Sequence, residues 1–194
     1  MTKLGWSILA IILVAVVASG SMLSFGPGRL RAPAAPRNST PVAPAVAGAL
    51  TIPVAGVTRS ALHDSWGDAR GGGTRAHHGI DIVAPAGARV VAAGAGTVEK
   101  LFQSELGGTT LYVRSADGRW VHYYAHLAGY ALGIREGLNV RAGDLLGFVG
   151  DTGDAGAGNY HLHFGVQRMG PGQRWWKGED VNPYPLLAGK PPAR

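Results

Sequence analysis

The stretch Arg75-Ala76-His77-His78-Gly79-Ile80-Asp81 has a counterpart about eighty residues later in His161-Leu162-His163. Both segments place histidines beside apolar residues that favour a strand. Residues two apart on a strand share one face, so the imidazoles of His161 and His163 are expected to point the same way. Because the chain contains no cysteine, a metal site built here has to use nitrogen and oxygen ligands.

His77 and Asp81 stand four positions apart, which is about 13 Å on a fully extended strand. That separation is too large for two ligands of one ion. The chain is therefore expected to bend between them, at Gly79. Each histidine alone is more often a hydrogen-bonded structural residue than a ligand. Together with His161 and His163, the residues His77 and Asp81 supply three or four candidate ligands, and zinc hydrolases typically use three protein ligands with a fourth position left for water.

The composition predicts an all-β fold. The 194 residues include 31 glycines and 12 prolines, and no long helical periodicity occurs beyond the first 25 residues, which is typical of a domain with many turns. We expect a compact antiparallel β-sheet or barrel-like domain with long loops. The segments that resemble short strands are 80–83, 88–92, 96–101, 109–114, 120–125, 145–149 and 162–167.

Three local patterns refine this fold. Asp117-Gly118 lies between two strand-like segments and predicts a hairpin turn. Residues 140–147 resemble a strand–turn–strand unit. Residues 128–135 have a short and weak helical pattern.

The chain divides into three parts. Residues 1–25 are apolar and uncharged from residue 4 onward, long enough to span a bilayer, and they predict a membrane anchor or a signal sequence. The length favours the anchor, and the sequence leaves cleavage open. Residues 26–50 are rich in proline and alanine and predict a semi-extended linker. Residues 51–190 are expected to form the folded domain.

The positive charge is concentrated at the start of the chain. Lys3, Arg29, Arg31 and Arg37 give the first 50 residues a charge of +4, whereas the remainder carries 14 basic and 12 acidic residues, or +2. A basic segment of this kind suits an anionic cell envelope or simply solubility. The arginines are scattered and no nucleic-acid-binding motif is present, so nucleic acid is not an expected partner.

Three histidine motifs occur in a fixed order along the chain. The motifs are Arg75-x-His77-x-Gly79-Ile80-Asp81, Tyr124-Ala125-His126-Leu127 and His161-Leu162-His163-Phe164. With these three motifs in this order, the chain resembles the lysostaphin/LytM-type zinc endopeptidases over residues 57–187.

The resemblance implies a role for each of five residues. His77, Asp81 and His163 match the ligands of one Zn²⁺ ion, and His126 and His161 match two catalytic histidines beside it. A neutral histidine can accept the proton of the attacking water, and a charged one can donate to the leaving amine or to the oxyanion. The sequence does not decide which of the two histidines acts as the base.

Two further histidines have other interpretations. On a strand, His78 would face away from His77 and Asp81, so it is not expected to bind the metal. His122 would share a face with His126 on a regular strand. It could then support the site from behind, although a packing or surface role is more common.

The function implied by the resemblance is zinc-dependent hydrolysis of peptide bonds in peptidoglycan stems or cross-bridges. The specificity, for D-Ala–diamino acid bonds or for glycine bridges, stays open, as does the oligomeric state. The expected location is the cell envelope, with the catalytic domain anchored outside the cytoplasm, or secreted if the leader is cleaved. Three arginines after the apolar segment oppose this orientation under the positive-inside rule.

Two other functions compete with this one. Some relatives of such enzymes lose their ligands and regulate other wall hydrolases, but all five site positions here keep the expected residue type. A lipoyl- or biotin-carrier domain would share the Gly-rich turns. A carrier needs a modifiable lysine on an exposed hairpin, and neither Lys100 nor Lys177 has that setting.

Overall fold

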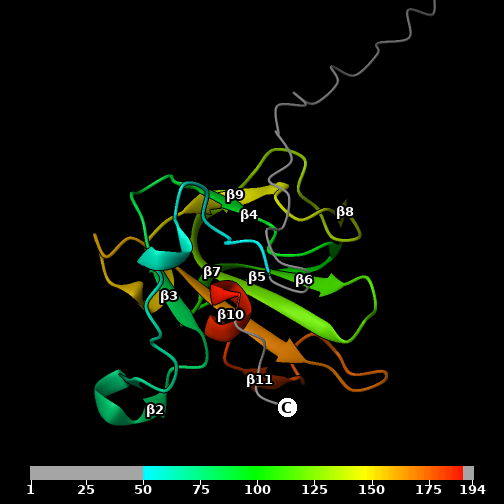
Figure 1. Ribbon diagram of the computed structural model, residues 1–194. Helices are drawn as coiled ribbons and strands as arrows, with labels where there is room; N and C mark the ends of the chain where they lie inside the picture. Colours follow the sequence, from blue (N-terminus) through cyan, green and yellow to red (C-terminus); the bar gives the residue numbers. More distant parts are fainter. Residues whose placement is uncertain (1–49, 190–194) are drawn as a thin grey trace, which may run out of the picture. The chain divides into compact units, whose positions relative to one another are not determined.

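The computed structural model describes residues 50–189, which form an all-β domain as the composition predicts. The described strands form a nine-stranded antiparallel sheet (Figure 1). Six of them follow the order β11-β10-β7-β6-β5-β8. In addition, β3 pairs with β10, and β9 pairs with both β7 and β4. The strands are β3 (Ile80–Val83), β4 (Arg89–Val91), β5 (Gly96–Ser104), β6 (Gly108–Ser115), β7 (Trp120–Tyr130), β8 (Asn139–Val140), β9 (Leu145–Val149), β10 (His161–Arg168) and β11 (Glu179–Val181).

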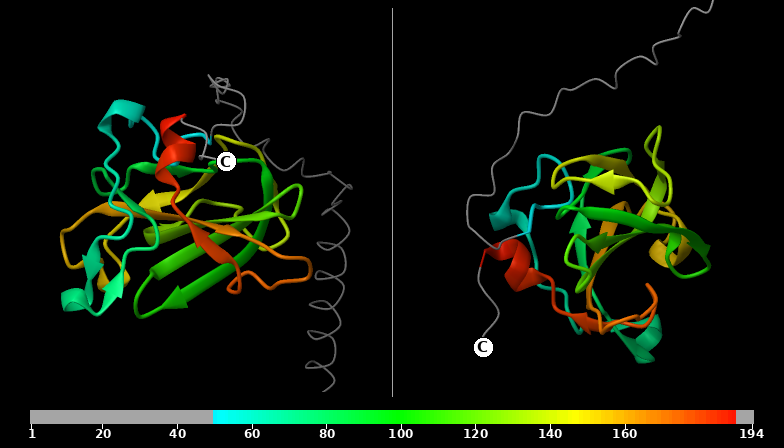
Figure 2. Two further views of the ribbon diagram at one scale, coloured as in Figure 1. Left: turned by 60° about the horizontal axis from the view of Figure 1, so that its bottom comes forward. Right: turned by 90° about the vertical axis from the view of Figure 1, so that its right-hand side faces the viewer.

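The two faces of the sheet differ in polarity. Successive residues of a strand point to opposite faces, so Leu162 and Phe164 of β10 pack into the core while His161 and His163 face the other way. On β3, Ile80 and the next alternate residue, Ile82, join the same core. Burial of this apolar face stabilises the domain and leaves the opposite face of β3, β7 and β10 for polar side chains. Figure 2 shows how strongly the sheet curls.

The hairpin predicted at Asp117-Gly118 is confirmed, since β6 and β7 pair on either side of it. The unit predicted at 140–147 contains two strands, but they do not pair with each other: β8 pairs with β5, and β9 pairs with β4 and β7. The helix suggested over 128–135 is wrong. Residues 128–130 end β7 and bond to β9, because sheet pairing outweighs a weak helical preference.

Short elements complete the domain. The hairpin of β1 (Ala69–Arg70) and β2 (Arg75–Ala76) encloses the 3₁₀ turn η2 (Gly71–Gly73) and projects from the sheet (Figure 1). The 3₁₀ turn η1 (Arg59–Ala61) contacts the short helix α2 (Tyr184–Ala188), whose Leu187 is buried, and η3 (Gly153–Ala155) follows β9.

The expected membrane segment over residues 1–25 lies outside the described residues, as does the linker over 26–50 apart from Leu50. Across 50–189, none of the helices has the length and apolarity that crossing a membrane requires.

Candidate metal centre and active site

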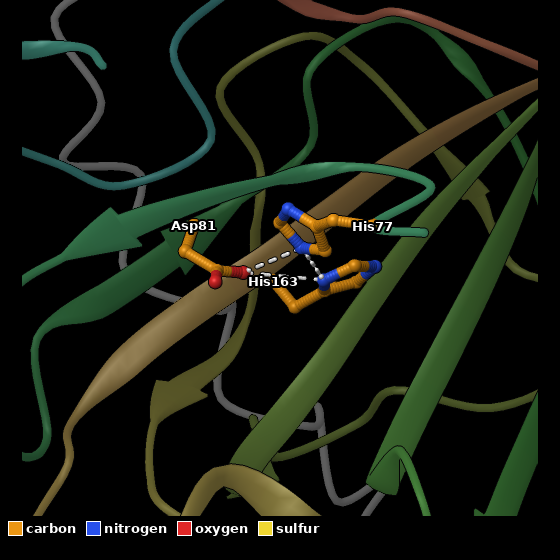
Figure 3. A group of neighbouring side chains, drawn as sticks. All are labelled: His77, Asp81 and His163. Carbon is orange, nitrogen blue, oxygen red and sulfur yellow. Dashed lines mark hydrogen bonds and ion pairs between the residues drawn. The ribbon is translucent and has the colours of Figure 1, made fainter. Parts of the chain in front are cut away.

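The three residues expected to bind zinc converge on one point (Figure 3). His77 Nε2 lies 2.8 Å from His163 Nδ1 and 3.0 Å from Asp81 Oδ1, and His163 Nδ1 lies 3.2 Å from the same oxygen. Ligands about 2.0–2.1 Å from a zinc ion at tetrahedral angles would be about 3.3 Å apart. Two imidazole nitrogens and one carboxylate oxygen at these separations therefore fit a zinc ion by both chemistry and spacing.

Strand register brings two of these ligands together. Asp81 of β3 is directly opposite His163 of β10, and directly opposite residues of paired strands share one face. His77 lies before β3, outside the strand, which confirms that the chain bends between His77 and Asp81. The bend is at Gly79, as expected. Its φ is not in the left-handed region, but a Cβ there would come within 2.7 Å of the His163 ring.

Ser65 supports the centre from the loop before β1. Its backbone oxygen accepts a hydrogen bond from His77 Nδ1 at 2.7 Å. Because a carbonyl oxygen can only accept, the proton of this buried imidazole is on Nδ1 and the lone pair of Nε2 points to the ligand cluster. The Ser65 hydroxyl oxygen also accepts from the backbone N–H of Asp81 at 3.1 Å. The sequence offers no signal for this residue, which lies twelve positions before His77.

Arg70 orients the carboxylate ligand. Asp81 directs Oδ1 towards the two histidines, while its Oδ2 accepts a hydrogen bond from Arg70 Nη2 at 2.7 Å. Burial alone would raise the pKa of Asp81, but its close contacts with His163 and His77 outweigh burial and hold this pKa well below its usual range. The carboxylate is therefore ionised, as a metal ligand has to be. A lone arginine in a Gly-rich segment gave no reason to expect this contact.

His126 reaches the same face by a break in β7. Two residues of β7, Ala125 and His126, oppose the single residue Thr110 of β6, which is a β-bulge. His126 has a φ of 60°, within the left-handed region that residues other than glycine rarely adopt. Its backbone N–H donates to Gly107 O at 2.8 Å, outside the regular ladder. The bulge therefore turns the imidazole away from the core and into the cleft.

His126 and His161 present their rings to the metal centre in the same way. His126 Nδ1 donates to Thr152 O at 2.8 Å and His161 Nδ1 donates to Asn159 O at 2.9 Å, which leaves Nε2 of each ring as an acceptor. His161 Nε2 lies 3.7 Å from Asp81 Oδ1. Burial lowers the pKa of His126, against the hydrogen bond to Thr152, so its imidazole is neutral near pH 7.

The two remaining histidines of interest lie outside the ligand cluster. His122 lies on the core face with Tyr124 and packs near the Phe164 ring, with 4% of its surface exposed. The expectation that it shares a face with His126 is wrong, because the bulge separates them. His78 points away from the ligands, as expected, and its Nδ1 donates to Asp180 Oδ2 at 2.7 Å.

The three candidate ligands line one cleft of about 950 Å³ together with His126 and His161. One wall of this cleft is the β1–β2 hairpin, and another is the loop that contains η3. Its charged residues, with the histidines counted as neutral, are Arg70, Arg75, Asp81 and Asp154.

Comparison with known proteins places this arrangement in a family. Residues 75–183 match the model of Peptidase family M23. The chain is 37% identical over 136 residues to the L-Ala–D-Glu endopeptidase of Bacillus subtilis, covering 67% of this chain and 40% of that protein. It is 33% identical over 93 residues to the peptidoglycan DD-endopeptidase ShyC of Vibrio cholerae, covering 48% and 21%. The chain thus spans less than half the length of these two relatives.

Solved structures show the same fold. The catalytic domain of lysostaphin from Staphylococcus simulans superposes with a TM-score of 0.53 at 28% identity, over 63% of this chain and 88% of that one. The catalytic domain of the prophage-encoded M23 protein EnpA from Enterococcus faecalis, solved as a mutant, gives 0.51 at 28% identity, over 63% and 87%. The family match covers more than half of the chain, including the three candidate ligands and both neighbouring histidines, and the chain therefore belongs to peptidase family M23.

Proposed function

We propose that this chain is a zinc-dependent endopeptidase that hydrolyses peptide bonds in peptidoglycan stems or cross-bridges. The observation that carries the proposal is the convergence of three candidate ligand atoms beside the imidazole rings of two further histidines in a single cleft. The M23 family and the peptidoglycan endopeptidases among the relatives support the choice of substrate.

His77, Asp81 and His163 would hold the ion. The chemistry that zinc supplies in such a site is Lewis acidity towards the substrate carbonyl and a lowered pKa of water. The donor set carries one negative charge, so it would leave a bound divalent ion with a net charge near +1. Such a set contributes three ligands, which fits a hydrolytic rather than a purely structural role.

His126 and His161 would handle the protons. Each has Nδ1 held by a backbone carbonyl, which leaves Nε2 to accept a proton and return it to the leaving amine. The histidine that is protonated in the transition state can donate a hydrogen bond to the developing oxyanion. Loss of either ring would therefore remove a proton-transfer group without removing a ligand.

The proposed location is the cell envelope, with the domain anchored outside the cytoplasm by residues 1–25 or secreted if they are cleaved. Two features of the sequence support it: the apolar leader and the Pro/Ala-rich linker that follows. A tether of this kind would hold the domain within reach of a wall polymer.

The test is mass spectrometry of wall fragments after incubation of purified sacculi with the full-length zinc-loaded chain. We expect new peptide ends that chelator and His163→Ala both abolish, and that Arg168→Gln, at an ion pair far along β10 from the site, leaves unchanged. Unchanged fragments despite bound zinc would contradict the enzyme assignment. A wild type that neither binds zinc nor cleaves would instead support the non-catalytic regulatory module.

A further inference from the structure

The net charge of the cleft would be positive with a divalent ion bound at the ligand cluster. Arg70 and Arg75 lie on the wall formed by the β1–β2 hairpin, and Asp81 and Asp154 are the two acidic residues. With histidines neutral, these four charges sum to zero, and a divalent ion at the ligand cluster would bring the cleft to +2. A positive cleft attracts an anionic peptide and offers no such advantage to a neutral one.

The two arginines differ in what they can offer a substrate. Arg70 is already paired with the candidate metal ligand Asp81, because its Nη2 donates a hydrogen bond to Asp81 Oδ2 at 2.7 Å. A substrate could engage Arg70 only by releasing that carboxylate. Arg75 makes no contact with the ligands and pairs with Asp154 through Nη2.

The Arg75–Asp154 ion pair joins two walls of the cleft. Arg75 is in β2 and Asp154 is in η3, 79 positions later. The two side chains are 44% and 39% exposed. Ion pairs with this exposure contribute at most about 1 kcal/mol, so another carboxylate can replace Asp154 at little cost. The guanidinium group matches a carboxylate through two parallel N–H groups.

Arg75 is close to the metal centre along the chain. It precedes His77 by two positions, about 6–7 Å on an extended segment. A carboxylate held by its guanidinium group would therefore belong to the substrate residue next to the cleaved bond, or to the one after it.

We propose that Arg75 selects peptides with a free carboxylate within about two residues of the scissile bond, and that Asp154 is the internal counter-ion that the substrate displaces. The inference rests on the proposed function and narrows it, because it favours acidic peptide stems over glycine bridges. One relative is named for a bond on the amino side of D-Glu, a residue whose second carboxyl group is free in such a stem. The carboxylate at the peptide's own C-terminus is the other source.

The first experiment measures binding without turnover. The full-length chain is treated with chelator and titrated calorimetrically with the peptide L-Ala-D-Glu-L-Lys-D-Ala-D-Ala, in which D-Glu is linked through its side chain. Two further peptides carry a carboxamide at the free D-Glu carboxyl or at the C-terminus, and pentaglycine amide serves as the neutral peptide. We expect one of the two carboxamides to raise the Kd about fivefold, which also identifies the source of the carboxylate.

Binding measurements on variants test whether Arg75 causes this difference in Kd. Arg75→Gln should bind the acidic peptide as weakly as the wild type binds the amidated one, and Arg75→Lys should retain part of the preference because it keeps the charge but loses the planar fork. Asp154→Asn should bind the acidic peptide more tightly than the wild type, because the competing carboxylate is gone. The matched control is Arg168→Gln, which breaks another exposed arginine–carboxylate pair, with Glu179, and should leave all Kd values unchanged.

Two results would overturn the inference: equal Kd values for all three stem peptides in the wild type, or an unchanged preference in Arg75→Gln. Cleavage of the same peptides by the zinc-loaded chain is measured separately. Equal cleavage of acidic and amidated stems would remove the inference and leave the endopeptidase function intact. A preference in binding with no cleavage at full zinc occupancy would remove the function and keep Arg75 as a recognition residue.

Discussion

His126 and His161 face each other with ring centroids 4.8 Å apart, although they come from different strands and reach the cleft by different routes. His161 follows the normal alternation of β10, whereas His126 depends on a bulge and a left-handed backbone. Both rings are oriented by a bond from Nδ1 to a backbone carbonyl, on Thr152 and Asn159. These bonds leave Nε2 of each ring as the acceptor atom, which the proposed proton transfer requires.

Replacement of either histidine should stop hydrolysis and spare the metal. We expect His126→Asn and His161→Ala to lower kcat on peptidoglycan peptides about 10²- to 10⁴-fold, the usual contribution of a general acid or base, while zinc content stays at the wild-type level. Asparagine suits position 126 because it tolerates the left-handed backbone. Equal activity of either variant and the wild type would show that the missing ring takes no part in proton transfer.

Arg70 should control how tightly the metal is held. Arg70→Gln removes the donor that fixes Asp81 Oδ2, so Asp81 Oδ1 is held less firmly towards the histidines. We expect zinc affinity to fall about 10- to 100-fold, as for other groups that orient metal ligands, in a competition titration with a chromogenic chelator. Arg168→Gln is the control, and unchanged affinity in Arg70→Gln would contradict a positioning role.

Tyr124 should contribute to stability through its hydroxyl group. Its oxygen accepts the Ala93 N–H at 2.8 Å, and both residues are buried. Tyr124→Phe leaves that N–H without a partner, which costs about 1–3 kcal/mol. Urea unfolding should show the free energy of unfolding fall by this amount, with zinc binding unchanged. No change would mean that the N–H finds another acceptor.

His122 should make the domain sensitive to acid. Burial lowers its pKa from 6.5 to about 4, so the unfolded chain takes up a proton at a higher pH than the folded one. The contribution of neutral His122 to the free energy of unfolding is therefore complete above pH 6.5. It is lost as the pH falls towards 4, and this lowers the free energy of unfolding by roughly 3 kcal/mol. His122→Leu should flatten the pH dependence of urea unfolding between pH 7 and 4. Parallel curves for variant and wild type would contradict this assignment.

Sequence patterns predicted the parts of the site that depend on local alternation. The strand around His163 and the strand around Asp81 follow from period-two apolar patterns, and their pairing places both ligands on one face. The bend before Asp81 followed from spacing alone. These features are local or nearly so, which is why a single sequence can indicate them.

The remaining features depend on contacts between distant segments. The bulge at His126 arises from pairing with β6, and a regular strand would have placed this ring beside His122 in the core. Arg70 and Ser65 reach the centre because the segment before β3 folds over it. Pairing of β7 with β9 likewise replaced the expected helix. Neither residue type nor spacing signals these contacts.

The most direct test of the central claim is the zinc content of the purified full-length chain, measured by inductively coupled plasma mass spectrometry. We predict one zinc ion per chain in the wild type and a large loss in His77→Ala, Asp81→Ala and His163→Ala, because each removes one of three converging ligand atoms. Circular dichroism confirms that the variants are folded. A wild type without zinc, or three folded variants that all retain it, would contradict the account.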